Sequence, residues 1–300
     1  MLTSMIRNFG NLLFLKVLNR WVAGRSADDA LRYCKNLNKK KSNCMVNYLG
    51  EHYTEVAPVF ATVKEYKRLI DMMSRNSITI KPSQLGFNVL AKKDSEKFCE
   101  QQMLEIIKHA AEKKVFVWID MEDRDSVDFT VRFYRKHISK YRMGICLQAN
   151  VERTEKDLLG LIKLSEKHNV YVRLVKGIYQ GDIEDPHELH VKFLSLISIA
   201  FEQSPKTFGI AVASHHTQAI ELALKLQEEH KKKFFEIQVL KGVLPGYYEE
   251  LRELGVKVVE YVPYGPDAFP YSIRRALKNP RFANSILFAP FFDTYHKLYG

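Results

Sequence analysis

The stretch MGICLQAN (143–150), the segment TEKDLLGLIKLSEKHN (154–169) and the stretch VYVRLVKG (170–177) together decide the fold. The first and third are short apolar runs with β-branched residues, which is typical of buried strands. The middle segment has helical periodicity, and Thr154 is its expected N-cap. Four of its residues share one helical face: Leu158, Leu161, Ile162 and Ser165. A helix between two buried strands predicts parallel pairing through a right-handed crossover.

The same alternation continues through the rest of the chain. Strand-like runs occur at 44–51, 77–82, 115–122, 143–150, 170–177, 208–216, 235–242 and 256–265. Helical periodicity returns between them, as in SEKFCEQQMLEIIKHAAEKK (95–114). Eight such units spaced roughly thirty residues apart match the proportions of a (β/α)8 barrel. We therefore predict an α/β fold with a TIM-like (β/α)8 barrel. An open doubly wound sheet remains the competing architecture, because it shares the alternation.

The chain is predicted to form one domain over residues 1–300. Its 300 residues include 46% hydrophobic residues, which is enough for one large core. No linker rich in proline, glycine or serine divides it. We expect a helical extension at 1–42 and the barrel at 43–300.

Nothing in the sequence resembles a membrane-crossing or secretion segment. No stretch approaches the ~20 apolar residues of a membrane span. The N-terminal stretch 1–21 lacks the small-residue cleavage site of a signal peptide. The four cysteines form no CxxC pair and suit reduced thiols: Cys34, Cys44, Cys99 and Cys146. A cytoplasmic location is expected, with peripheral contact at the inner face of the membrane left open.

The formal net charge of +11 raises the question of an anionic partner. Lysines cluster in KNLNKKKSN (35–43) and HKKKF (230–234), which lie between patterned segments as solvated loops do. No nucleic-acid-binding motif accompanies them, so we expect no nucleic-acid partner. Attraction to an anionic membrane surface is compatible with the same charge.

Polar residues recur where the predicted strands end. In chain order these residues are Glu51, Lys81, Asp120, Gln148, Arg173, Ser214, His215, Gln238 and Tyr261. The carboxyl ends of barrel strands converge on one mouth, so these side chains are expected to line a polar pocket there. The segment YSIRRALKN (271–279) adds Arg274 and Arg275 to the cations Lys81 and Arg173. Surplus cation in a confined mouth predicts an anionic ligand, because arginine binds carboxylate or phosphate with two parallel hydrogen bonds.

Several nucleotide and metal motifs are missing. No GxGxxG follows a predicted strand, and no GxxxxGKS occurs, so a Rossmann site and a P-loop are unsupported. The spacing of HELH (187–190) does not place two zinc ligands on one helical face. We predict no metal site. A metal-dependent hydrolase that uses Asp120, Glu122 and His215 with His216 remains an alternative.

A set of short motifs resembles the monofunctional proline dehydrogenase family. The motifs are WVAGRSADDAL (21–31), LGE (49–51), ITIKP (78–82), IDMED (119–123), RLVKGIY (173–179), ASHH (213–216), YVPYG (261–265) and YSIRR (271–275). The resemblance spans nearly the whole chain in matching order. It implies a distorted barrel with the last helix over the mouth. It also implies a flavoenzyme that oxidises L-proline to 1-pyrroline-5-carboxylate by hydride transfer to FAD, with electrons passed on to a membrane quinone.

The resemblance also implies roles for substrate-site residues. Lys81, Arg274 and Arg275 would hold the proline carboxylate. Tyr261 would pack against the pyrrolidine ring and disfavour a hydroxylated one. Glu51 would pair with Arg274 as a gate over the substrate. The remaining two, which would support and line the site, are Asp120 and Leu240.

A second group of residues would hold FAD. Arg173 would lie near the flavin N5. The others implied by the resemblance are Gln148, Val175, Lys176, Gly177, Tyr179, Ser214, His215, His216 and Gln238.

Two positions depart from the family pattern. Lys278 stands where the family usually places an acid, and His216 where it places asparagine. Lys278 adds a third cation beside Arg274 and Arg275. A paralogue that binds flavin without catalysis, or acts on another substrate, is therefore a further alternative.

Overall fold

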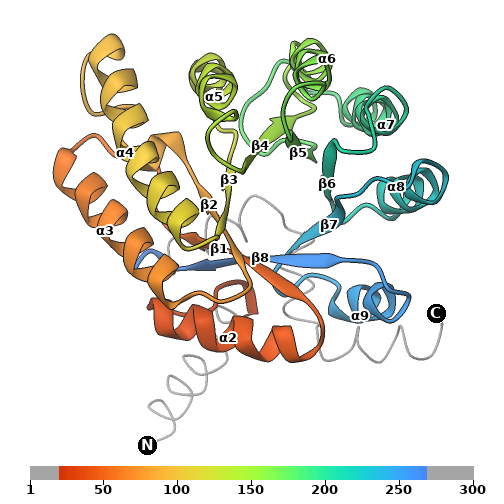
Figure 1. Ribbon diagram of the computed structural model, residues 1–300, viewed down its shortest axis with the longest axis horizontal. Coiled ribbons are helices and arrows are strands. Elements are labelled where there is room, and N and C mark those ends of the chain that lie inside the picture. The colour runs from red at the N-terminus through yellow and green to blue at the C-terminus, as the bar shows by residue number, and fades with distance from the viewer. Residues whose placement is uncertain (1–19, 269–300) are drawn as a thin grey trace, which may run out of the picture.

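Eight parallel strands close into a barrel in which neighbouring strands follow the order of the chain (Figure 1). The computed structural model describes residues 20–268. Its strands are β1 (Asn43–Tyr48), β2 (Ser77–Ile80), β3 (Phe116–Ile119), β4 (Met143–Gln148), β5 (Tyr171–Val175), β6 (Gly209–Ala213), β7 (Phe235–Leu240) and β8 (Val258–Tyr264). β8 pairs in parallel with β1, from Asn43 opposite Val259 to Tyr48 opposite Tyr264. The predicted (β/α)8 barrel is confirmed, and the open doubly wound sheet is wrong.

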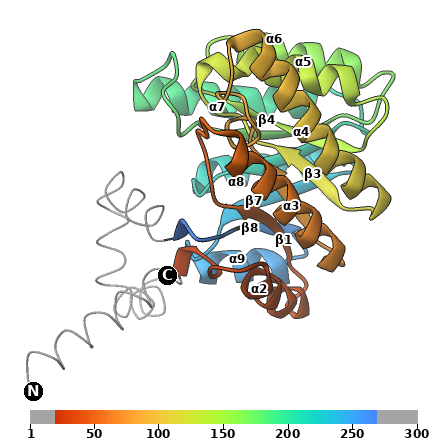
Figure 2. The same cartoon turned by 90° about the vertical axis from the view of Figure 1, so that its left-hand side faces the viewer.

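Helices cover the outside of this barrel (Figures 1 and 2). They are α2 (Ala27–Lys39), α3 (Val56–Met72), α4 (Lys92–Glu112), α5 (Arg124–His137), α6 (Thr154–Leu164), α7 (Pro186–Glu202), α8 (Thr217–His230) and α9 (Pro245–Glu253), with a short 3-10 turn η1 (Pro82–Gln84). α2 packs beside β1 and β8 and buries Ala27, Ala30 and Cys34. The segment YSIRRALKN, expected over the mouth, lies outside the described residues.

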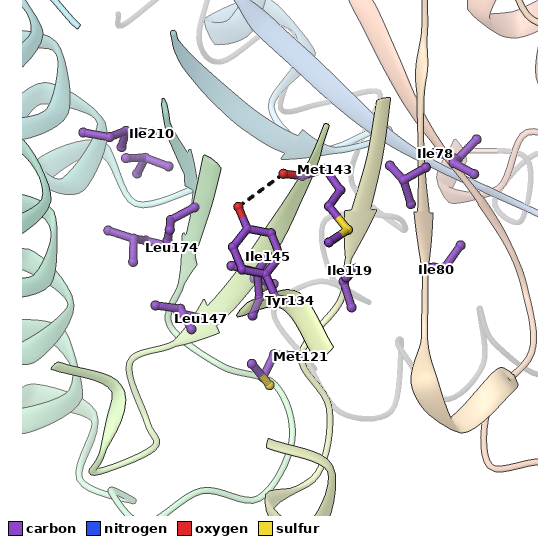
Figure 3. Packing of buried hydrophobic residues seen from close by; sticks show 14 of the residues in the cluster. Ile78, Ile80, Ile119, Met121, Tyr134, Met143, Ile145, Leu147, Leu174 and Ile210 are labelled. Carbon is purple, nitrogen blue, oxygen red and sulfur yellow. Dashed lines mark hydrogen bonds between the residues drawn. The ribbon is translucent and has the colours of Figure 1, made fainter. Parts of the chain in front are cut away.

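The main hydrophobic core lies between the strands and the helices. Isoleucine, leucine and methionine side chains from neighbouring strands fill this layer (Figure 3). Tyr134 of α5 is fully buried in it, and its hydroxyl donates to the backbone oxygen of Met143 at 3.2 Å. The same hydroxyl accepts from the amide of Tyr171 at 3.0 Å, so it ties α5 to both β4 and β5.

A second core fills the barrel itself. Its buried members are Met45, Trp118, Tyr171, Ala211 and Val259. Two cations stack on its aromatic rings near the amino ends of the strands. Arg142 lies 5.4 Å from the Tyr171 ring centre, and Lys257 lies 4.6 Å from that of Phe234. The barrel is therefore packed below its mouth, as in other barrels of this type.

All eight strand-like runs contain a strand, but most extend beyond its carboxyl end. The helix after β4 buries the face that was expected, which carries Leu158, Leu161, Ile162 and Ser165. Its N-cap is Arg153, however, so the assignment of Thr154 as N-cap was wrong. The Thr154 hydroxyl donates to the backbone oxygen of Gln148 at 2.5 Å and so links the start of α6 to the end of β4.

Candidate active site

Lys81 occupies the first position after β2 and points into a polar cluster. It has an extended backbone, as the following Pro82 requires. Its ammonium donates to Glu51 Oε2 at 3.0 Å and to the Tyr179 hydroxyl at 3.3 Å. That hydroxyl in turn donates to Glu51 Oε2 at 3.1 Å. The loops after β1, β2 and β5 thus meet at one cation.

Lys81 and Glu51 carry opposite charges. Burial acts to lower the pKa of Lys81, but Tyr261, Tyr179 and the nearby carboxylates outweigh it and hold that pKa well above its usual range. Burial acts to raise the pKa of Glu51, but Lys81 outweighs it and the pKa is lowered. At neutral pH, Lys81 is a cation beside an anionic Glu51.

A second ion pair lies deeper, inside the barrel. Arg173 of β5 is only 3% exposed and pairs with Asp120 Oδ1. The Thr79 hydroxyl donates to the same oxygen at 2.8 Å. The Tyr261 hydroxyl donates to Asp120 Oδ2 at 3.1 Å. Arg173, Thr79 and Tyr261 are all donors to this carboxylate, which favours its charged form.

Arg173 is held on several sides. Its Nη1 lies 3.5 Å from Gln238 Oε1 and 3.0 Å from Met45 Sδ, and its guanidinium lies 5.5 Å from the Trp118 ring centre. Burial lowers its pKa to about 10, against the opposing effects of Tyr261 and Glu236, so the group stays charged at neutral pH. Its Nε is buried and finds no acceptor among residues 20–268.

Three residues expected at strand ends lie within strands instead. Arg173, Gln238 and Tyr261 belong to β5, β7 and β8. The side chains of Arg173 and Gln238 are buried inside the barrel, where they meet each other. Tyr261 belongs to the deeper cluster through its hydrogen bond to Asp120, and it is also among the groups that raise the pKa of Lys81.

The segment after β5 turns sharply at the mouth. The backbone amides of Ala149 and Asn150 donate to the backbone oxygens of Val175 (2.8 Å) and Lys176 (2.9 Å). Gly177 has a φ of +115°, and a Cβ there would overlap the Asn150 side chain. Asn150 Nδ2 donates to the backbone oxygen of Tyr179 at 2.8 Å, while its Oδ1 is buried with no partner in the described part of the chain.

Lys176 and Gln148 flank this turn. Burial lowers the pKa of Lys176, and no carboxylate in the stretch from 20 to 268 pairs with its ammonium. Gln148 is 2% exposed, and its Nε2 donates to the backbone oxygen of Glu122 at 2.8 Å.

The Ser214–His216 segment divides between the barrel wall and the surface. His215 Nδ1 lies 2.5 Å from the Tyr248 hydroxyl, and its Nε2 accepts from the amide of Leu240 at 3.3 Å. The Ser214 hydroxyl accepts from the amide of His216 at 3.1 Å. Burial, then His190 and Lys176, lower the pKa of His216, whose ring centre lies 4.2 Å from that of His190.

Arg274, Arg275 and Lys278 lie outside the described residues. Within the described chain, no group of three or more His, Cys, Asp or Glu side chains is placed to hold a metal ion. Asp120 and Glu122, considered for the hydrolase alternative, instead accept hydrogen bonds from Arg173 and Ser83.

Four residues of the site were missed or undervalued from the sequence. Thr79 and Trp118 hold the Asp120–Arg173 pair, Asn150 holds the turn after β5, and Ser83 bonds Glu122. Asn150 ends the predicted strand 143–150, so its place at a strand exit was a usable signal. Trp118 gave no such signal, because an aromatic residue in an apolar run is ordinary core.

A closed parallel barrel with paired charges gathered at the carboxyl ends of its strands defines a (β/α)8-barrel enzyme. A family model described as Proline dehydrogenase matches residues 30–286. The chain belongs to the proline dehydrogenase family, whose activity is the oxidation of proline.

Individual relatives agree with this assignment. The chain is 28% identical to proline dehydrogenase 1 of Bacillus subtilis subsp. natto over 297 residues, covering 95% of this chain and 93% of the relative. It is 26% identical to proline dehydrogenase of Deinococcus radiodurans, covering 87% of this chain and 86% of the relative. The expected family resemblance is confirmed.

The fold also matches a solved structure. The crystal structure of proline utilization A from Bdellovibrio bacteriovorus, inactivated by N-propargylglycine, superposes with a TM-score of 0.81 at 21% identity. The match covers 88% of this chain and 33% of that longer chain. Sequence identity this low supports the fold alone.

Proposed function

We propose that this protein oxidises L-proline to 1-pyrroline-5-carboxylate with FAD as hydride acceptor, and that electrons pass on to a quinone. The observation that carries the proposal is the meeting of two charged clusters through Tyr261. One cluster holds Lys81 at the mouth, and the other holds Arg173 inside the barrel. A small amino acid has an anionic end and an apolar ring, and these clusters offer a cation beside an aromatic side chain.

The residues at the mouth fit a flavin dinucleotide. The Arg173 Nε is a buried donor without an acceptor in the described residues, and Lys176 is a cation without a described carboxylate partner. Gly177, with a φ of +115°, allows the turn between them to pass close to Asn150. Arg173, Gln148, Gln238 and the segments Val175–Tyr179 and Ser214–His216 would hold FAD. FAD supplies a ring that accepts a hydride when bound.

The chain's own side chains would mainly orient the substrate. Lys81, with Arg274 and Arg275, would bind the proline carboxylate, and Leu240 would line the pocket. Glu51 would pair with Arg274 as a gate. Hydride leaves a ring carbon next to the nitrogen once that nitrogen is neutral. Fixing the carboxylate and the ring therefore supplies much of the rate, through positioning.

Tyr179 would act at the substrate end as well as beside the cofactor. Its backbone belongs to the turn assigned to FAD, whereas its hydroxyl lies between Lys81 and Glu51. It would therefore help fix the direction of the Lys81 ammonium. The Asp120–Arg173 pair would keep a cation next to the reacting ring.

We also propose a cellular location for the protein and a division of its chain. Among residues 20–268, none of the helices is both long and apolar enough to traverse a lipid bilayer. We propose a cytoplasmic protein in contact with the membrane surface where a quinone acceptor resides. We propose that the chain consists of an N-terminal extension at 1–42 and a barrel at 43–300.

An anaerobic absorbance spectrum tests the proposal. The purified protein, supplied with FAD and then freed of excess, should show oxidised-flavin absorbance that L-proline bleaches. Absence of bound flavin after FAD is supplied would contradict the flavoenzyme assignment. Bound flavin that proline leaves oxidised would instead favour the non-catalytic paralogue suggested by Lys278.

A further inference from the structure

Glu122 is a buried carboxylate that the proposed reaction does not use. It lies three residues beyond β3 and is 1% exposed. Both of its oxygens accept from one residue. Oε2 accepts from the amide of Ser83 at 2.8 Å, and Oε1 accepts from the Ser83 hydroxyl at 2.7 Å. Burial raises the pKa of this carboxyl group, against the opposing effects of Lys81 and Ser83, so the two-point contact offsets part of the cost of burying its charged form.

Ser83 passes this contact on to the loop after β1. Its hydroxyl accepts from the amide of His52 at 3.1 Å while it donates to Glu122. Its backbone oxygen accepts from the amide of Tyr53 at 3.1 Å. His52 immediately follows Glu51, and Ser83 follows Lys81 by two residues. One serine therefore joins the two loops that carry the Lys81–Glu51 pair.

The backbone at His52 shows why this loop must be held. His52 has a φ of +56°, in the left-handed region that non-glycine residues rarely adopt. Such a conformation persists only where its surroundings enforce it. The Ser83 hydroxyl bonds the amide of this very residue, and Glu122 fixes the hydroxyl. Ser83 and Glu122 therefore hold the backbone of the residue that follows Glu51.

We infer that Glu122 is a positioning residue for the proline carboxylate site, acting through Ser83 on Glu51 and Lys81. This inference rests on the proposed function. The backbone oxygen of Glu122 accepts from Gln148 Nε2 at 2.8 Å, which anchors it to β4. The Tyr179 hydroxyl lies 3.5 Å from Glu122 Oε1, so the third loop of the Lys81 cluster also touches it. Glu122 makes no hydrogen bond to Lys81 among the described contacts, so its effect on the position of Lys81 passes through its neighbours, while its charge also helps raise the pKa of Lys81.

The substitution Glu122→Gln tests the inference with little change in size. An amide can accept only one of the two Ser83 donors, so the contact to Ser83 weakens. We expect KM for L-proline to rise about ten-fold, as loss of a hydrogen bond to a charged group implies. We expect kcat to change by less than about three-fold, and flavin content to match wild type. The matched control is Glu105→Gln, which removes an exposed carboxylate paired with Lys67 on the outer surface.

Two further measurements separate positioning from general damage. Ser83→Ala should raise KM in the same direction. The double variant should raise KM by less than the product of the single effects, because both changes break one chain of contacts. The pH profile should also move: Glu122 helps raise the pKa of Lys81, so the alkaline loss of kcat/KM should begin at lower pH in Glu122→Gln.

Amide hydrogen exchange across residues 49–53 gives a readout that needs no activity. Faster exchange there in Glu122→Gln and Ser83→Ala, but not in Glu105→Gln, supports the inference even if wild type fails to oxidise proline. Unchanged KM with unchanged exchange in a folded Glu122→Gln overturns it. If Glu122→Gln does not fold, Ser83→Ala decides alone by the same two readouts.

Discussion

Tyr261 is the residue on which substrate selection should depend. Its hydroxyl is held by Asp120 Oδ2 at 3.1 Å, and it acts electrostatically on both Lys81 and Arg173. A ring held by its hydroxyl in this way would present a defined wall to a small substrate. The Tyr261 side chain would thus limit both the size of the substrate ring and its orientation.

The substitution Tyr261→Ser should relax discrimination against hydroxyproline. Removing the ring opens space where a ring hydroxyl would otherwise collide, and such steric contacts are worth ~1–3 kcal/mol. We expect the ratio of kcat/KM for hydroxyproline to that for proline to rise roughly ten-fold. The ratio is measured with a soluble dye acceptor. Tyr264→Phe, which loses only a bond to Glu65 on the outer side of β8, is the control. An unchanged ratio would place the selecting group elsewhere.

Gly144 sets the position of Trp118 and, through it, of Arg173. A Cβ at Gly144 would overlap the ring of Trp118, which is 1% exposed and lies 5.5 Å from the Arg173 guanidinium. Gly144→Ala should therefore lower the free energy of unfolding by about 1–3 kcal/mol, the usual effect of overpacking. It should also reduce flavin content. Gly246→Ala is the control, because nothing lies within 4 Å of its added Cβ, and stability there should hold or rise. Equal free energies of unfolding of both variants in urea titration would show that the Trp118 side chain moves aside without measurable cost.

At the scale of elements, strand positions could be predicted well because each buried parallel strand is a continuous apolar run. The residue at which each strand ends was harder to predict, because burial continues past the strand into the loop at the barrel mouth. Met121 and Glu122, for example, are buried beyond β3 and lengthen its apparent run. The gathering of polar and charged side chains near the mouth was predictable from the polar residues near strand ends. Its geometry was not, because a sequence does not show which loops meet in space. The Tyr179 hydroxyl lies beside Glu51, 128 positions away along the chain.

Lys232 joins two outer helices at the amino ends of the strands. It follows α8, is 5% exposed, and its ammonium donates to the backbone oxygen of Ser204 after α7 at 2.6 Å. Burial lowers its pKa to about 8. Between about pH 8 and the usual lysine pKa near 10.4, the unfolded chain binds this proton and the folded chain does not. The contribution of Lys232 to stability should therefore increase as pH rises through this window.

The substitution Lys232→Met isolates that contribution. We expect the free energy of unfolding of wild type, relative to the variant, to be larger at pH 10 than at pH 7.5. Urea titrations at both values measure the difference. Lys233→Met changes an exposed neighbour in the same linker and should leave the difference flat. A wild-type advantage that is constant with pH would mean that Lys232 stays charged in the folded protein.

At the scale of the whole molecule, charge is divided between the two ends of the barrel. The eight linkers from helix to strand carry thirteen lysines and arginines and one carboxylate, Glu166. They include the runs 40–41, 113–114 and 231–233. The seven described loops from strand to helix carry nine carboxylates and four cations. This division matches the helix dipoles, because helix carboxyl ends favour cations and amino ends favour anions. The linkers at the amino ends of the strands, opposite the mouth, therefore carry a surplus of cations, and we call them the basic face, although Lys40, Lys113 and Lys257 pair with carboxylates there.

The basic face predicts how the protein would meet an anionic membrane. Each lysine near such a surface contributes about 1 kcal/mol to binding. The charge-reversing double substitution Lys231→Glu with Lys233→Glu should therefore weaken binding to anionic vesicles by at least about ten-fold. The matched double substitution Lys92→Glu with Lys93→Glu reverses two exposed charges at the mouth end of α4 and should leave vesicle binding nearly unchanged. Cosedimentation measures both, and high salt should abolish the wild-type signal. Because the mouth faces away from this face, bound vesicles should not slow proline-driven reduction of a soluble dye. Inhibition of dye reduction by vesicles, together with lost binding in the Lys92 and Lys93 variant, would show that the mouth itself meets the membrane.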